Sequence, residues 1–422
     1  MSTLPQAPTM PSTLTRRRLF GCCGAIGAGL FTSLGASATH CAEPLPVHLR
    51  RHERVLAAFD GIDASALWDV HAHLLGNGDS GSGCRVHPHL EQWWHPVEHL
   101  RQRSVLGAAC VETGAPSVDR AYVDRLVQLT QDFPAGARWL LFAFDQAIDE
   151  QGRERPDWTT FHVPDAHAAR VAGQHPGRFD WVASIHPHRP DALPRLDTAV
   201  ADGARALKWL PSAMAIDLRD PRLRPFYDRL ARHGLPLIVH CGEEKAVPGA
   251  GRGELGNPLL VRAPLARGVR VIVAHCASLG DALDLDARHP VPRPAFELFA
   301  RLMDETDGRQ RLLGDISAVF QANRSPEVWK AVLANTRWHD RLLHGSDYPL
   351  PGVGWLHRPH AMQRAGLLSR EAADLLQALR PHNPLLYDFV LKRELRLRGQ
   401  GLPASVFETR RHFVPAPRAA SA

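Results

Sequence analysis

Several short motifs that would assign a function are missing from this sequence of 422 residues. It has no Gly-rich dinucleotide fingerprint, no CxxC pair and no Lys/Arg block interleaved with aromatic residues. A dinucleotide-binding doubly wound sheet, a zinc knuckle and a nucleic-acid surface are therefore not expected. Internal repeats are absent too, and no apolar run after residue 38 is long enough to span a membrane.

Cysteine is scarce, with seven residues in the whole chain. Five of them follow residue 38, an odd number without metal-binding spacing, so no disulfide framework is predicted. Cys241 and Cys276 each follow a histidine at the end of an apolar run. Strand alternation turns them to the face opposite that histidine, where we expect small buried residues.

The first 38 residues are predicted to be an export signal. Arg16, Arg17 and Arg18 precede an uncharged stretch from Gly21 to Leu34, which Ala36-Ser37-Ala38 follows. This order resembles a twin-arginine signal cleaved near Ala38, so we expect the twin-arginine export machinery as a partner and a periplasmic location. The alternative is a protein anchored in the inner membrane. Removing the segment lowers the net charge from +6 to +3.

Apolar runs that alternate with helix-like segments predict an α/β fold. The run 105–111 keeps three- and four-residue steps, so a helix is assigned over 97–112. Eight strands remain, and helix-like segments between them imply parallel pairing through right-handed crossovers. They are expected at 66–72, 139–145, 180–186, 205–210, 235–240, 269–275, 311–317 and 341–346.

Eight such units predict a (β/α)₈ TIM barrel with C-terminal helices packed on it. The expected organisation is a signal at 1–38, an N-terminal helix within 39–63, the barrel at 64–392 and an extension at 393–422 with a disordered end. The oligomeric state is not predicted.

Ionisable residues stand at the ends of most of the predicted strands. In a barrel these ends open on one face, so the side chains converge there. His71 and His73 are one residue apart on a strand, and two imidazoles on one side can bind one ion. The other members of the series are Lys208, His240, His275, Asp315 and Asp347.

At these residues the chain resembles the amidohydrolase superfamily, in the amidohydrolase-related branch of the aminocarboxymuconate-semialdehyde decarboxylase type. The resemblance runs from about Trp68 to Phe389. Its phrases are DVHAH, HPGRFDWVASIHP, GARALKWLP, RLARHGLPLIVHCGEE, GVRVIVAHCAS, GDISA, LLHGSDYP and HNPLLYDF.

The resemblance implies a divalent metal held by His71, His73, His240 and Asp347. His275 would bind a second ion or polarise the substrate, and Asp347 would also collect a proton from the activated water. Zinc is expected, with manganese, iron, nickel or cobalt as alternatives and with one or two ions. Asp315 is expected to brace a ligand.

Lys208 decides between two reactions. Hydrolytic members with two metals often carry a carboxylated lysine at this position, and the decarboxylase members typically lack it, so Lys208 favours hydrolysis. A protonated Lys208 that binds a substrate carboxylate or pairs with Asp347 is an equal alternative.

The expected function is therefore a metal-dependent hydrolase that cleaves a C–N or C–O bond of a small carboxylated molecule, such as an amide, lactone or ester. A non-oxidative decarboxylase of an aromatic or muconate-like acid is the alternative, and a non-catalytic exported binding protein is a remote one. Glu243, Glu244 and His186 are the candidates for substrate contact, because they lie immediately past strand ends.

Overall fold

The computed structural model describes residues 43–92, 94–112, 114–305 and 310–414. The predicted signal at 1–38 and the last eight residues of the extension lie outside these ranges. Within the described residues, no helix combines the length and the apolar character needed to cross a membrane.

Eight parallel strands form a closed barrel. Three pair in the order β1-β3-β5 and five in the order β6-β7-β8-β11-β12. Parallel bridges between Ala183 and Leu207 and between Ala72 and Tyr348 join the two groups. The barrel strands are β1 (Trp68–His73), β3 (Arg138–Phe142), β5 (Phe179–Val182), β6 (Leu207–Trp209), β7 (Leu237–His240), β8 (Val271–Ala274), β11 (Leu312–Asp315) and β12 (Leu342–Leu343). All eight predicted strands and the (β/α)₈ barrel are confirmed.

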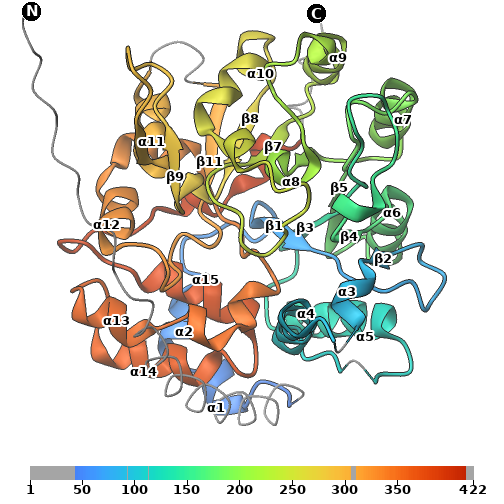
Figure 1. Ribbon diagram of the computed structural model, residues 1–422. Helices are drawn as coiled ribbons and strands as arrows, with labels where there is room; N and C mark the ends of the chain where they lie inside the picture. The colour runs from blue at the N-terminus through green and yellow to red at the C-terminus, as the bar shows by residue number, and fades with distance from the viewer. Residues whose placement is uncertain (1–42, 93, 113, 306–309, 415–422) are drawn as a thin grey trace, which may run out of the picture. The chain divides into compact units, whose positions relative to one another are not determined.

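Helices surround the strands on the outside, as Figure 1 shows. The predicted helix over 97–112 is present as α4. The outer helices of at least eight residues are α4 (Pro96–Ala108), α5 (Val118–Thr130), α6 (Asp165–Gln174), α7 (Ala192–Ala201), α9 (Arg224–His233), α11 (Ala295–Asp304), α12 (Pro326–Ala334), α14 (Arg370–Leu379) and α15 (Pro384–Glu394).

Shorter elements fill the connections. Two short helices, α1 (Val47–Arg50) and α2 (Glu53–Ala57), replace the one helix expected before the barrel. The chain begins a second helix here because the ring of His52 accepts a hydrogen bond from the backbone N–H of Arg54 and caps α2. The other short elements are α3 (Pro88–Glu91), α8 (Pro211–Met214), α10 (Arg262–Ala266), α13 (Pro359–Arg364), β2 (Arg85–Val86), β4 (Phe161–His162), β9 (Asp281–Leu283) and β10 (Pro292–Pro294).

Two loops on the carboxyl side of the barrel are joined to each other. The loop after β1 contains β2, the loop after β3 contains β4, and these two strands pair antiparallel. Both loops follow the carboxyl ends of barrel strands, so the ribbon that joins them lies on the side where active sites of this architecture are built.

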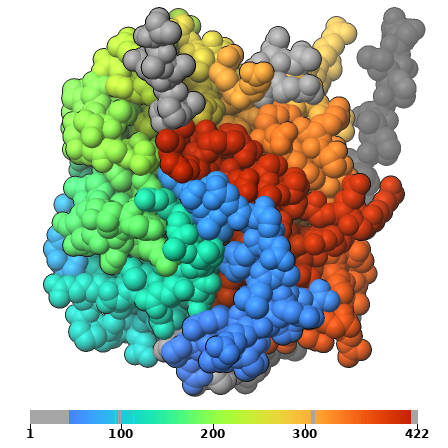
Figure 2. Space-filling model, turned by 180° about the vertical axis from the view of Figure 1, so that it is seen from behind, coloured from blue at the N-terminus to red at the C-terminus, as the bar shows by residue number. Residues whose placement is uncertain are grey.

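The C-terminal segment closes the opposite end of the barrel. Phe413 packs with the inward-facing residues of the strands and stacks on Trp68 with ring centroids 6.5 Å apart. The Thr409 hydroxyl donates to the carbonyl oxygen of Trp68 at 2.7 Å. Figure 2 shows this red segment beside the blue segment that leads into β1. Part of the predicted extension therefore belongs to the barrel core.

Cysteine behaves partly as expected. Cys241 and Cys276 are buried, unpaired, and packed with the outward-facing core residues. Cys110 is disulfide-bonded, which the cysteine spacing did not predict.

A buried ion pair fastens α15 to the loop after β12. The Lys392 ammonium donates to Asp388 Oδ2 at 2.5 Å and to the carbonyl oxygen of Gly345 at 2.6 Å. Burial raises the pKa of Asp388 to about 6, against the opposing effect of Lys392.

This raised pKa predicts a pH dependence of stability. The native carboxyl keeps its proton up to about pH 6, whereas the unfolded chain releases it near pH ~4. The contribution of Asp388 to the free energy of unfolding should therefore be complete below pH ~4 and fall by about 3 kcal/mol as the pH rises to ~6. Urea unfolding from pH ~4 to ~7 should show the stability of Asp388→Asn rising relative to that of the native protein. The exposed Asp374→Asn serves as a control, and identical pH profiles for all three proteins would contradict the assignment.

Candidate metal centre

Both histidines of β1 reach the barrel interior because the strand carries a bulge. Val70 belongs to the inner core and Ala72 to the outer core, so simple alternation along the strand is broken between them. The register with β3 shifts between Asp69 and Ala72. A bulge of this kind re-aims the side chains that follow it, and here it turns His71 and His73 inward.

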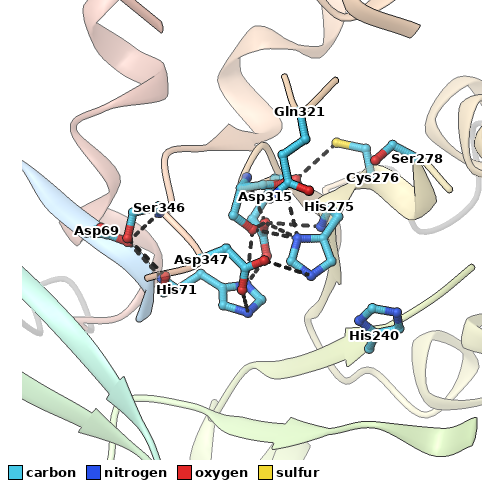
Figure 3. A network of polar contacts seen from close by, with 12 residues as sticks. Asp69, His71, His240, His275, Cys276, Ser278, Asp315, Gln321, Ser346 and Asp347 are labelled. Atoms are coloured by element: carbon cyan, nitrogen blue, oxygen red, sulfur yellow. Dashed lines mark hydrogen bonds and ion pairs between the residues drawn. The ribbon is translucent and has the colours of Figure 1, made fainter. Parts of the chain in front are cut away.

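Asp69 holds the bulge in place. One carboxylate oxygen, Oδ1, accepts the backbone N–H of His71 at 3.0 Å and that of Ser346 at 2.9 Å. Figure 3 shows Asp69 and Ser346 on the far side of His71 from His240 and His275. Burial raises the pKa of Asp69 to about 7. Asp69 therefore connects the start of the barrel to its last strand.

Asp315 orients the ring of His71. Its Oδ2 lies 3.0 Å from His71 Nδ1, and both side chains are fully buried. This contact leaves His71 Nε2 directed at the carboxylate of Asp347, 3.4 Å away, without a hydrogen bond of good geometry. A carboxylate behind a histidine is the usual arrangement in metal sites, because it fixes the ring and raises its basicity. Burial lowers the pKa of His71 to about 4, which keeps the ring neutral and its lone pair free.

Three imidazoles surround the carboxylate of Asp347. Oδ1 lies 3.1 Å from His73 Nε2 and 3.4 Å from His71 Nε2, and Oδ2 lies 3.9 Å from His275 Nε2. Burial acts to raise the pKa of Asp347, but His275 and the contact with His73 outweigh it and hold the pKa well below its usual range. The carboxylate is therefore ionised.

His275 lies on a strained turn immediately after β8. His275, Cys276 and Ala277 have φ values of 55°, 50° and 49°, and Asp347 has a φ of 60°. Residues with side chains rarely adopt this region, and they persist there when the surrounding structure holds them. At His275, Nδ1 lies 2.8 Å from the hydroxyl and 3.1 Å from the carbonyl oxygen of Ser317, which leaves Nε2 facing Asp347.

The loop after β12 comes close to His71 because residue 345 is glycine. A Cβ atom at Gly345 would lie 2.7 Å from Cβ of His71, closer than carbon atoms can approach. Only glycine lets the backbone pass at this point, and this close approach sets the place of Asp347 two residues later.

His240 ends β7 beside this network. Its ring centroid lies 5.2 Å from that of His275, and its Nε2 lies 3.3 Å from Glu244 Oε2 without a hydrogen bond of good geometry. Figure 3 shows His240 with no dashed contact to the other labelled residues. Glu244 also accepts the backbone N–H groups of Ala246 and Val247 at 2.5 and 2.9 Å, so it both shapes the loop and approaches the site.

Lys208 presents a buried amine to the same region. Its Nζ lies 5.2 Å from the ring centroid of Phe142 and makes no hydrogen bond within the described residues. The ring of Phe142 in turn lies 4.5 Å from that of His71. Burial lowers the pKa of Lys208, while the charges of Asp315 and Asp347 act in the opposite direction.

The remaining two candidates for substrate contact are engaged elsewhere. Both ring nitrogens of His186 contact backbone, since Nε2 lies 2.8 Å from the carbonyl oxygen of Met214 and Nδ1 accepts the N–H of His188 at 3.3 Å. Glu243 is exposed, and its carboxylate lies 3.3 Å from Lys245 Nζ. Their substrate-binding roles remain predictions.

The donor set fits a divalent cation. Ligand atoms of His71, His73 and Asp347 lie within 4.8 Å of one another, and those of His71, His275 and Asp315 form a second such group. His240 and Lys208 belong to neither group, although each has a buried nitrogen without a hydrogen-bond partner among the described residues. Neutral imidazole and carboxylate ligands at converging buried positions suit zinc and its neighbours in the transition series.

Ser317 is the residue of this centre that sequence reasoning missed. Its hydroxyl contacts His275 and Asp315 and lies 3.2 Å from His71 Nδ1. The phrase GDISA contains Ser317 two residues after Asp315, and this spacing on a strand was the available signal.

Solved structures with a similar backbone are distant in sequence. A TIM-barrel protein from Bordetella bronchiseptica is 18% identical, with 74% of this chain and 98% of that chain covered and a TM-score of 0.45. The 5-carboxyvanillate decarboxylase from Sphingomonas paucimobilis is 11% identical, with 82% of this chain and 98% of that chain covered and a TM-score of 0.46. The 4-oxalomesaconate hydratase from Rhodopseudomonas palustris is 13% identical, with 77% of this chain and 93% of that chain covered and a TM-score of 0.38. At this distance they carry no argument about the reaction.

Comparison with curated proteins finds no match. The family model described as amidohydrolase matches residues 68–383, which span the barrel from β1 to the loop before α15. The matched segment contains every histidine, aspartate and lysine of the centre described above. The chain therefore belongs to the amidohydrolase family.

Proposed function

We propose that this protein is a metal-dependent hydrolase that cleaves a C–N or C–O bond of a small carboxylated substrate. The observation that carries the proposal is Lys208, a buried amine without a hydrogen-bond partner in the described chain, beside the histidines and aspartates of the centre. A buried amine in this position needs a counterpart, because an unpaired polar group away from water is costly.

His71, His73, His240 and Asp347 would hold the divalent cation, most suitably zinc. A carboxylated Lys208 would supply two more oxygens, and with His275 it would complete a site for a second ion. The bound cation supplies a polarised water of lowered pKa and an electrophile for the substrate oxygen.

The protein's own groups then handle the proton. Asp347 is ionised and lies 3.1 Å from His73 and 3.9 Å from His275, so its carboxylate can accept a proton from a water held among these rings. The same carboxyl would return that proton to the leaving nitrogen or oxygen. Asp315 and Ser317 keep the rings of His71 and His275 in place while this happens.

Decarboxylation is the second candidate, and the charges around Lys208 favour it. Burial lowers the pKa of this lysine, whereas the charges of Asp315 and Asp347 act in favour of its ammonium form. An unmodified ammonium group would bind the carboxylate of an aromatic or muconate-like acid, and one ion would suffice to orient that acid.

Metal stoichiometry separates the two reactions. Protein comprising residues 39–422, loaded with zinc or manganese and freed of excess metal, should contain two ions per chain by elemental analysis if Lys208 is carboxylated. One ion with an unmodified Lys208 would favour decarboxylation. Protein that retains no metal would contradict both reactions.

We propose further that the protein is exported to the periplasm by the twin-arginine machinery. The order of Arg16, Arg17 and Arg18, the uncharged stretch from Gly21 to Leu34 and the following Ala36-Ser37-Ala38 supports this location. Replacing Arg16 and Arg17 with lysine should leave the protein in the cytoplasmic fraction of fractionated cells. Unchanged appearance in the periplasm would contradict the proposal.

A further inference from the structure

Arg324, in the loop after β11, carries a positive charge that forms no ion pair with an acidic residue of the described chain. The side chain is partly buried, and all its hydrogen bonds within the described residues go to neutral groups. Arg262, by comparison, pairs with Asp286 and Glu305. Burial lowers the pKa of Arg324 to about 10, against the opposing effect of the charges of Asp347 and Glu244.

Neutral side chains hold the guanidinium in a fixed orientation. Nε donates to the Ser278 hydroxyl at 3.3 Å, and Nη1 donates to Gln321 Oε1 at 2.9 Å and to Asn323 Oδ1 at 2.6 Å. Nη2 makes no hydrogen bond to any residue that the structure describes. A guanidinium held in this way offers a planar edge that suits a carboxylate.

The side chain of Arg324 contacts the turn that carries His275. The backbone N–H of Ser278 donates to the carbonyl oxygen of His275 at 2.9 Å, so Ser278 connects the guanidinium to the His275 turn. The charges of Asp347 and Glu244 act on Arg324, and its own charge acts on His240. Figure 3 shows Gln321 and Ser278 on the His275 side of the network.

Gln321 contributes a second unused donor. Its side chain is 2% exposed, and its Nε2 has no hydrogen-bond partner among the described residues, although its Oε1 is occupied by Arg324. A buried amide donor without an acceptor costs free energy unless a ligand supplies one. Gln321 Nε2 and Arg324 Nη2 thus both lack an acceptor among the described residues, and Arg324 carries a charge.

We propose that Arg324 and Gln321 form a subsite for a carboxylate group of the substrate, at the edge of the metal centre. The inference rests on the proposed function and names the residues that recognise the substrate carboxylate. The preferred ligands therefore place one oxygen-containing group at the metal and a carboxylate at Arg324. Gln321 acts with Arg324 as a neutral donor.

Binding of diacids to the zinc-loaded protein tests the subsite without turnover. Calorimetry would compare malonate, succinate and glutarate with the corresponding monoamides, which keep one carboxylate for the metal and lose the second charge. We expect at least one diacid to bind more tightly than its monoamide. Arg324→Met should lower the affinity for that diacid by about 10- to 100-fold, the usual effect of losing hydrogen bonds to a charged group. The affinity for the monoamide should not change.

Two further variants complete the design. Arg324→Lys keeps the charge without the planar edge and should lose part of the preference for the diacid. Arg262→Met removes an arginine that is already paired with Asp286 and Glu305, and it should change the affinity for neither ligand.

The subsite would be contradicted if no diacid exceeded its monoamide in the native protein. An equal loss of affinity for the diacid and the monoamide in Arg324→Met would also contradict it, because that result indicates only a general electrostatic effect on the centre. Zinc content is measured for every variant. Protein that binds no zinc contradicts the proposed function, whereas zinc-loaded protein that binds diacids independently of Arg324 contradicts the subsite alone.

Discussion

Replacing Asp347 with asparagine should lower kcat/KM by about 10²- to 10⁴-fold, the usual contribution of a positioned general base. Asparagine keeps an oxygen near His71 and His73 but cannot accept a proton at neutral pH. Its effect should therefore fall on turnover far more than on the fold. The measurement is steady-state hydrolysis of a panel of carboxylated amides, lactones and esters, with circular dichroism to compare the folds.

The metal content of Asp347→Asn is the necessary companion measurement. Protein that loses its metal together with its activity would show only that Asp347 is a ligand. Asp217→Asn provides a matched control, because Asp217 is an aspartate paired with Arg219 away from the centre. Full activity in Asp347→Asn with bound metal would contradict the assignment of the base.

Lys208→Ala should remove one of the two ions and lower the affinity for it by about 100-fold or more, since losing even an outer partner of a metal ligand costs 10- to 100-fold. The carboxylated amine would be the shared ligand of both ions, so hydrolysis should fall with the second ion. Protein equilibrated with ¹³C-bicarbonate should show a carbamate carbon signal by NMR that Lys208→Ala lacks.

Rescue distinguishes a missing ligand from a damaged fold. Acetate or propionate can enter the space left by the lysine side chain and should restore part of the second metal equivalent in Lys208→Ala. The exposed Lys245→Ala should retain both ions and the carbamate signal. Two ions in Lys208→Ala without any added acid would contradict the bridging role.

The barrel could be predicted from the sequence because its signals are local. Each strand is a short apolar run, and ionisable residues stand at the ends of most of the predicted strands. Lys208 and His240 are examples. Each lies two residues after an inward-facing core residue, Ala206 in the one case and Ile238 in the other, so alternation along the strand turns both side chains to the barrel interior. The convergence of the strand ends then follows from the architecture.

The exact geometry of the centre depends on contacts between distant residues. The bulge that turns His71 inward requires Asp69, Ser346 and the register with β3, none of which leaves a local pattern. The turn at His275 depends on Ser317 and Asp315, about 40 positions away. His186 shows the same limit, because its strand-end position predicts nothing about the two backbone contacts that occupy its ring.

A crystal structure of the zinc-loaded protein, with anomalous scattering recorded at the zinc edge, tests the central claim most directly. We predict an anomalous peak about 2.0–2.1 Å from the ring nitrogens of His71 and His73, with an oxygen of Asp347 in the same coordination sphere. A second peak should lie beside Lys208 if hydrolysis is the reaction. A zinc-loaded crystal with no peak at His71 and His73 would contradict the metal centre on which the proposed function rests.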